Sequence, residues 1–284
     1  MKKVEVGLME EYQFTRTVSY DFGALANMFT EAFTGYFFPM NMTPEALANH
    51  WRLYHIDGAR SLVMRDPEGT FAGMTLIGAR GERGWCGGFG IAPAFRGHGA
   101  GKRLASEMIE TARISGLRSL QLEVLSQNEA ARAVYEAAGL TVRRRVLTVE
   151  IALTALPDET DTDAKHVAKS APLIAEDVLA AQPVWQQELA SLLAMTTETT
   201  HVTDTAGQRS SLVCARSGAL TRILAASVAK STTEQELIFL LRQAAGESSV
   251  IQLTNCPGSS SILARCLSLG FSEMYSQHEM YIAL

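Results

Sequence analysis

Cysteine is scarce in this sequence, and the few cysteines are scattered. No CxxC pair occurs and no histidine stands at zinc-binding spacing from a cysteine; the four positions are Cys86, Cys214, Cys256 and Cys266. This pattern argues against a disulfide framework and against a structural metal site, and it fits a reducing compartment. We therefore expect a cytoplasmic protein that binds no metal.

Long hydrophobic runs and an excess of basic residues are also missing. No apolar run reaches the roughly 20 residues that span a membrane, and no apolar stretch of a signal peptide follows the charged residues 1–5. The 25 Lys and Arg residues against 30 Asp and Glu residues give a net charge of −5. Nucleic-acid binders usually concentrate basic residues on one surface, and the short run Arg143-Arg144-Arg145 does not alter the balance. We expect neither a membrane nor a nucleic-acid partner, and either a monomer or a homodimer.

The chain length favours two domains. Single domains usually hold about 100–200 residues, whereas this chain has 284, of which 47% are apolar and available for two cores. Residues 157–163 read Pro-Asp-Glu-Thr-Asp-Thr-Asp and have the acidic, polar character of a linker. We predict a first domain over residues 1–154, a linker over 155–172 and a second domain over 173–284.

The first half alternates strand and helix patterns, which predicts an α/β fold with a mixed sheet. Strands are expected over 15–19, 61–64, 71–78, 85–91, 120–125 and 141–152, the second to fourth as an antiparallel meander. Helices are expected after Asp21, after Thr43-Pro44, and over 100–114 and 129–138. The aromatic stretch 33–42 fits either core or a pocket wall, and core is the default.

The second half repeats this order of elements. A helix-like pattern covers 178–195, and then come strands over 212–215 and 220–229, a helix over 233–245, a strand over 250–253, a helix over 260–269 and a strand over 279–284. Residues 135–140 also align with residues 266–271. We interpret this as an internal duplication; two unrelated α/β domains are the alternative.

A glycine-rich turn separates an apolar strand from an amphipathic helix. Gly97, Gly99 and Gly101 alternate in it, so the backbone can curl until several N–H groups point at one spot. The following helix adds its own unpaired N–H groups and the positive end of its dipole. The turn is therefore a candidate cradle for a phosphate or pyrophosphate; a glycine-rich turn without a ligand is the plainer alternative.

Two familiar phosphate motifs do not fit this turn. A P-loop requires Gly-x4-Gly-Lys-Ser/Thr, but Arg96 stands at its first glycine and Arg103 at its Ser or Thr. The dinucleotide motif Gly-x-Gly-x-x-Gly requires a glycine where Lys102 stands, and only an antiparallel meander precedes the turn. Residues 96–101, Arg-Gly-His-Gly-Ala-Gly, fit the pattern R-x-x-G-x-G instead.

This pattern resembles the acyl-CoA pyrophosphate loop of the GNAT superfamily of N-acetyltransferases. Downstream, Asn128, Ala131, Tyr135 and Gly139 follow the family's N-x-x-A-x-x-x-Y-x-x-x-G-F pattern, with Leu140 in place of the final Phe. The resemblance extends over residues 15–150. It implies a GNAT fold and acetyl-CoA as cosubstrate.

The resemblance also implies where acetyl-CoA would bind. Backbone groups of Phe89 and Ile91, on either side of Gly90, would pair with the pantetheine arm like an added strand. The pyrophosphate would be held by backbone N–H groups of the loop residues Arg96, Gly97, His98, Gly99, Ala100, Gly101 and Lys102. We expect the His98 side chain to face solvent and to take no part in catalysis. Asn128 would lie on the helix face that meets the CoA sulfur.

Acyl transfer to an amine needs a base, oxyanion donors and an acid. The resemblance implies that Tyr135 is the acid: it follows Asn128 by seven residues, about two helical turns, so both lie on the helix face that meets the CoA sulfur in the family. Glu123 is the predicted base: it lies on an internal strand, where burial would raise its pKa. Its spacing of twelve residues before Tyr135 resembles that in ribosomal-protein alanine N-acetyltransferases. For Tyr135 the alternative is a packed aromatic side chain. For Glu123 the alternatives are a structural carboxylate, or a water chain that acts as the base instead.

The second half lacks the glycine loop. Residues 230–233, Lys-Ser-Thr-Thr, follow its strand, and Cys266 stands in the place of Tyr135. We predict that this half does not bind CoA. Pro183-Val184-Trp185 and the segment around Trp51 also resemble a tandem-domain GNAT group.

The predicted function is acyl transfer. The acetyl group of acetyl-CoA would pass directly, in a ternary complex, to a primary amine of a small molecule or a peptide N-terminus. The alternative is a non-catalytic protein that binds or senses acyl-CoA.

Overall fold

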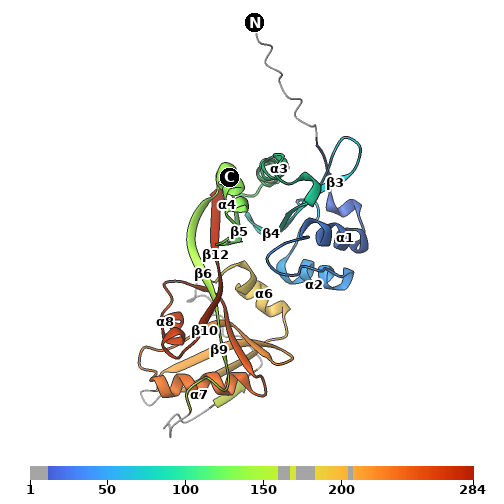
Figure 1. The fold of residues 1–284 in the computed structure, drawn as a ribbon. Helices are drawn as coiled ribbons and strands as arrows, with labels where there is room; N and C mark the ends of the chain where they lie inside the picture. Colours follow the sequence, from blue (N-terminus) through green and yellow to red (C-terminus); the bar gives the residue numbers. More distant parts are fainter. Residues whose placement is uncertain (1–11, 159–166, 171–182, 204–206) are drawn as a thin grey trace. The chain divides into compact units, whose positions relative to one another are not determined.

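Two compact units make up the protein, and they interleave along the chain. The structure, a computed structural model, describes residues 12–158, 167–170, 183–203 and 207–284 (Figure 1). Within these residues, unit 1 takes in 12–122, 129–141 and 281–284, and unit 2 takes in 123–128 and 142–280. Most of the predicted linker lies outside the described residues, and the domain limits at 154 and 173 stay a prediction.

Unit 1 is a sheet with helices packed on it. Its elements are β1 (Gln13–Arg16), η1 (Thr17–Ser19), α1 (Phe22–Ala32), α2 (Pro44–Tyr54), β2 (Leu62–Arg65), β3 (Phe71–Arg80), β4 (Arg83–Ile91), η2 (Pro93–Phe95), α3 (Ala100–Ile114), β5 (Ser119–Leu125) and α4 (Glu129–Ala137). The strand order is β1-β2-β3-β4-β5, antiparallel except for the parallel pair of β4 and β5. The predicted meander is therefore confirmed. The first strand is shorter than predicted, because its second half turns into η1.

Local sequence explains where the first helices begin. The Asp21 carboxylate accepts the Ala24 N–H at 2.7 Å and caps α1. The Thr43 hydroxyl accepts the Ala46 N–H at 3.1 Å, and Pro44 occupies the first position of α2, where its missing N–H costs nothing. Both predicted helix starts are confirmed.

A hydrophobic cluster fixes α3 against the sheet. Ala100 and Leu104 of α3 are fully buried and pack with Leu62 and Met64 of β2 and with Ala72 of β3. The first residue of α3 is thus part of the core. Because of this anchoring, the glycine turn that precedes Ala100 is held in one place on the sheet.

Unit 2 is a second sheet with its own helices. Its elements are β6 (Thr141–Ala152), β7 (Val167–Ser170), η3 (Trp185–Gln187), α6 (Leu189–Ala194), β8 (Glu198–Thr203), β9 (Arg209–Ser217), β10 (Leu220–Ser227), α7 (Glu234–Ala245), β11 (Val250–Pro257), α8 (Ser261–Ser268) and β12 (Ser272–Ala283). The strand order is β12-β6-β11-β10-β9-β8-β7. The core lies where α7 and α8 cover these strands.

The order of elements supports the predicted duplication. The series β9-β10-α7-β11-α8-β12 repeats β3-β4-α3-β5-α4-β6, and the strand before each long helix pairs in parallel with the strand after it. Three details differ from the prediction. Strands β7 and β8 lie where no strand was expected, β7 within the predicted linker. The described part of the helix-like stretch 178–195 contains only η3 and α6, and β12 starts at Ser272, well before residue 279.

Candidate functional site

Strand β4 is irregular at the position that precedes the predicted CoA-binding residues. Leu76 of β3 faces Gly88, but Ile77 faces Cys86, so Gly87 has no opposite residue on β3. This extra residue is a β-bulge, a feature common next to binding sites. Gly90 lies where α1 approaches the strand: a Cβ there would come within 2.7 Å of the Ala32 Cβ. Only glycine fits at that position without a shift.

The parallel pairing of β4 with β5 is short. It joins Arg83, Gly84 and Trp85 to residues 119–121, and within unit 1 it ends at Trp85. After Trp85, β4 still pairs with β3 along one of its two backbone edges, as far as Ile91. The other backbone edge of Phe89, Gly90 and Ile91 is therefore not paired with a strand in the described part of unit 1. Such an edge can hydrogen-bond an extended ligand.

The glycine turn has the backbone conformation that the sequence predicts. Gly97 and Gly99 have φ angles of 79° and 90°, in the left-handed region that favours glycine, and a Cβ on either would meet no atom within 4 Å. Gly99 precedes α3, whose first turn has no acidic residue and no side-chain cap. Arg103 donates the first helical hydrogen bond, to the Gly99 carbonyl at 3.1 Å. The N–H groups of residues 100–102, which precede Arg103, thus have no acceptor within the helix.

The Arg96 side chain braces this turn. Its Nε donates to the Ile91 carbonyl at 2.9 Å, and its Nη2 donates to the Ala32 carbonyl at 3.1 Å. The guanidinium therefore ties the loop to the end of β4 and to the end of α1. His98 is exposed, as predicted, and Gly101 packs near Val134 of α4, whose Cγ2 would lie 3.4 Å from an added Cβ.

Tyr135 lies beside β4, on α4. Its side chain is only 6% exposed, and its ring meets the Phe89 ring edge-on with 5.3 Å between centroids. Burial raises the pKa of Tyr135 well above 10.0, and Cys86 and Tyr36 raise it further. The phenol is therefore fully protonated at neutral pH, as a proton donor must be. Of the predicted residues, the structure thus brings together Phe89 and Tyr135, as well as Arg96 and Ile91.

Glu123 and Asn128 belong to unit 2. Glu123 lies on β5, and its Oε2 accepts a hydrogen bond of 3.0 Å from Nε2 of Gln186 in η3. Sequence reasoning missed Gln186, because a glutamine more than sixty positions away carries no local signal. Asn128 immediately precedes α4, and its N–H donates to the Leu125 carbonyl at 2.9 Å.

His50 of α2 is a further, partly buried polar group that sequence reasoning missed. Its ring packs against Tyr54 and Trp85, with centroid distances of 4.9 and 6.1 Å. Burial lowers the pKa of His50 to about 4, and a backbone hydrogen bond with Gly87 opposes this shift only in part. The imidazole is therefore neutral and tied to the bulge of β4. Only the regular apolar face of α2 could have hinted at its burial.

In the described parts of the chain, no group of three or more His, Cys, Asp or Glu side chains could hold a metal ion. No helix there is long and apolar enough to cross a membrane.

The comparisons with known proteins agree with this geometry. The model of the acetyltransferase (GNAT) family matches residues 24–140, which include the glycine turn, Tyr135 and Leu140. No curated protein matches the chain.

Solved structures match over nearly the whole chain. A GCN5-related N-acetyltransferase from Sphaerobacter thermophilus is 14% identical with a TM-score of 0.67, and 96% of this chain and 95% of that one are covered. A tandem GNAT protein from the clavulanic acid biosynthesis pathway is 12% identical with a TM-score of 0.64, over 96% and 98%. A putative acetyltransferase from Pyrococcus horikoshii is 13% identical with a TM-score of 0.58, over 96% and 89%. At such identities the likeness concerns the fold, which is that of two tandem GNAT-like domains.

Proposed function

Because residues 24–140 match the model of the acetyltransferase (GNAT) family, we propose that the protein transfers an acetyl group from acetyl-CoA to a primary amine. The acceptor is a small molecule or a peptide N-terminus. The transfer is direct, within a ternary complex. A cytoplasmic location and a monomeric or homodimeric state belong to the same proposal and rest on the composition of the chain.

The observation that carries this proposal is the turn before α3. Gly97 and Gly99 are left-handed, no atom lies within 4 Å of a Cβ added to either, and the helix behind them starts with unsatisfied N–H groups and no acidic residue. An anion is favoured at such a position by the N–H groups and by the helix dipole. Residues Arg96 to Lys102 would hold the pyrophosphate, and the edge of β4 from Phe89 to Ile91 would hold the pantetheine arm.

Tyr135 acts as the acid in this proposal. Acetyl-CoA supplies the activated thioester, and the departing sulfur needs a proton. The Tyr135 phenol carries its proton at neutral pH and would donate it to the sulfur as negative charge develops there. The Phe89 ring holds the Tyr135 ring against β4, where the acyl-bearing end of the ligand would lie.

Glu123 acts as the base in this proposal, directly or through a water chain. Its carboxylate must take a proton from the acceptor ammonium so that the amine can attack. Gln186 would orient the carboxylate by donating to one of its two oxygens. No acidic residue lies on β4, which leaves Glu123 on the adjacent strand as the candidate.

One observation favours a second function, non-catalytic binding of acyl-CoA. The hydrogen bond between Gln186 and Glu123 would equally suit a carboxylate that stabilises the fold. In that case the glycine turn would bind acyl-CoA as a signal, and Tyr135 would be a core residue.

Ligand-induced thermal shifts test the binding step first. Acetyl-CoA should raise the Tm, whereas ATP and NAD, which also carry phosphates, should not. A shift with ATP or NAD but none with acetyl-CoA would overturn the proposed function.

Thiol release then separates catalysis from sensing. Free CoA should form from acetyl-CoA only when a suitable amine from a broad panel is present, and a matched panel of tertiary amines serves as the control. Background release with every amine, together with intact acetyl-CoA binding, would support the non-catalytic function instead.

A further inference from the structure

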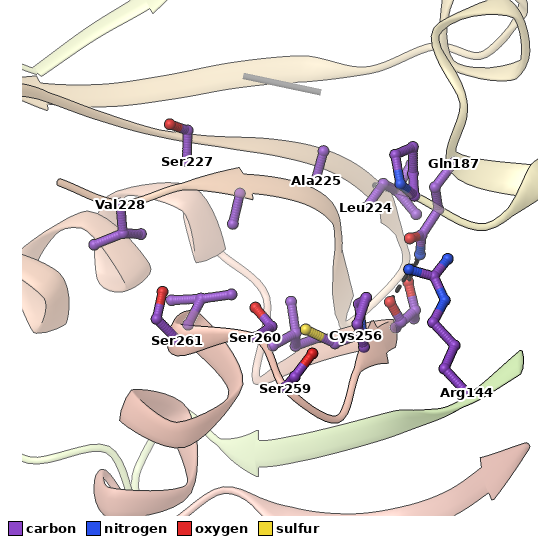
Figure 2. Close-up of a pocket in the computed structure, with 16 residues that line it drawn as sticks. Arg144, Gln187, Leu224, Ala225, Ser227, Val228, Cys256, Ser259, Ser260 and Ser261 are labelled. Atoms are coloured by element: carbon purple, nitrogen blue, oxygen red, sulfur yellow. Dashed lines mark hydrogen bonds between the residues drawn. The ribbon is translucent and has the colours of Figure 1, made fainter. Parts of the chain in front are cut away.

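Unit 2 contains a fork between two strands. β10 and β11 pair in parallel only up to Ile223 and Leu253; beyond them β10 continues along β9 and β11 continues along β6. A cavity of about 430 Å³ lies between the separating strands and the start of α8 (Figure 2). Ligand sites for small molecules usually measure about 300–1,000 Å³. The cavity is therefore large enough for a ligand.

Both walls of the fork are irregular. The register of β10 shifts between Ile223 and Ala225, and that of β11 shifts between Leu253 and Cys256. Within the second shift, Asn255 has a φ angle of 45°, in the left-handed region that costs a non-glycine residue energy. Bulges and strained residues of this kind gather at binding sites. The fork is thus a built feature of the sheet.

One end of the cavity offers hydrogen-bonding groups without a net charge. Gln187, only 5% exposed, donates from Nε2 to the Thr254 carbonyl at 2.8 Å and to its hydroxyl at 2.9 Å. Arg144 lies next to Gln187 (Figure 2) and is paired with the buried Glu279 through bonds of 2.6 and 3.2 Å. A neutral, amide-bearing group suits this end.

The other end is positively charged. Val228 and Ser261 line it, and they also line an adjoining hollow that contains Lys230, Arg265 and one acid, Glu234. Ser261 is the first residue of α8, so the dipole of that helix adds to the positive charge. A carboxylate suits this end.

The start of α7 explains why CoA does not suit the fork. Thr233 and Glu236 form a capping box, in which the Thr233 hydroxyl accepts the Glu236 N–H and the Glu236 carboxylate accepts the Thr233 N–H. Glu234 adds a second acid to the first turn. Two N–H groups at the helix end that corresponds to the start of α3 are therefore already bound by side chains, which leaves fewer donors for a pyrophosphate than at α3.

We propose that the fork of unit 2 binds a short extended peptide with a free C-terminal carboxylate. The peptide amides add to the open edge of β10 over residues 224–228, as an extra strand does. The carboxylate lies toward Lys230 and Arg265, and a backbone amide of the peptide lies toward Gln187. This site is separate from the proposed acetyl transfer and does not depend on it.

Hydrogen exchange of the full chain tests the proposal, with a randomised tripeptide mixture at millimolar concentration as the probe. Exchange over residues 224–228 should slow in the presence of the mixture. The same mixture with amidated C-termini should protect more weakly, by about two- to fivefold in apparent affinity, because an exposed ion pair is lost. Lys230→Gln should reduce the difference between the two mixtures.

Ser261→Phe provides the blocking variant. Ser261 is exposed at the start of α8, so the chain should fold, and the added ring should close the cavity and abolish protection over 224–228. Ser268→Phe, at the exposed end of the same helix, is the matched control and should leave protection intact.

Three outcomes would overturn the proposal. They are no protection over 224–228 with either mixture, protection confined to the β4 edge of unit 1, and protection over 224–228 by CoA alone. Acetyl-CoA-dependent thiol release is measured in parallel and should survive Ser261→Phe. A failure of peptide binding is therefore distinguishable from a failure of the proposed acetyl transfer.

Discussion

Replacing Gly99 by alanine should separate CoA binding from folding. Gly99 has φ 90° and ψ −9°, a conformation that L-residues rarely adopt, and nothing lies within 4 Å of an added Cβ. The strain on alanine is therefore the only direct cost, about 1–2 kcal/mol. In a chain of this size such a loss should lower the Tm by about 2–8 °C.

The effect on acetyl-CoA binding should be much larger. Alanine pulls the turn toward negative φ and turns N–H groups away from the position of the pyrophosphate. Each lost hydrogen bond to a charged group is worth about 1.5–3 kcal/mol, so Kd should rise by about 10- to 150-fold per bond. Isothermal titration calorimetry with acetyl-CoA measures this change.

Gly116→Ala is the matched control. Gly116 follows the other end of α3, has φ 83° and likewise has no atom within 4 Å of an added Cβ. Both variants should lose the same stability, but only Gly99→Ala should lose affinity. Wild-type affinity in Gly99→Ala, or an equal loss of affinity in both variants, would refute the pyrophosphate-loop assignment.

Four further predictions concern side chains. Tyr135→Phe should lower kcat by about 100-fold or more while the Kd of acetyl-CoA stays nearly constant; equal losses would remove Tyr135 as the acid. Glu123→Gln keeps an oxygen for Gln186 but should lower kcat by a similar factor and abolish the acidic limb of the pH–rate profile, and an unchanged profile would favour the structural role. His50 has a pKa of about 4 in the folded state, below the usual 6.5. Its contribution to the free energy of unfolding is therefore fully present above pH 6.5 and is lost as the pH falls toward 4. Urea titrations across this range should show that His50→Phe removes about 3 kcal/mol of the pH dependence. Arg144→Leu leaves Glu279, 1% exposed, as an unpaired buried charge and should cost about 3–5 kcal/mol, most of which the added change Glu279→Leu should restore if the pair is the cause.

Local sequence patterns determined the elements and the candidate loop. Asp21 and Thr43 cap helices through their own side chains, and Gly97 and Gly99 stand where the backbone needs left-handed angles. These signals depend on neighbours in the chain, so they are readable without a structure. The helix over 100–114 and the strand over 141–152 follow from periodicity in the same way.

Tertiary structure decided what lies opposite each candidate residue. Gln186 reaches Glu123 from far along the chain, and His50 is neutral because α2 packs it against Trp85 and the Gly87 bulge. Strand β12 begins seven residues before the predicted strand because sheet pairing extends into a polar stretch. None of these outcomes leaves a periodic or local signal.

The sequence by itself determined the order of elements in the first half, the glycine turn and the resemblance that links the turn to acyl-CoA, because turns, caps and periodicity are local. Only the tertiary structure decided that Tyr135 is buried against Phe89, and that β10 and β11 separate to leave a cavity in the half without the loop. Burial and strand separation depend on which distant segments pack together. The physical environment of each side chain therefore follows from packing between distant segments.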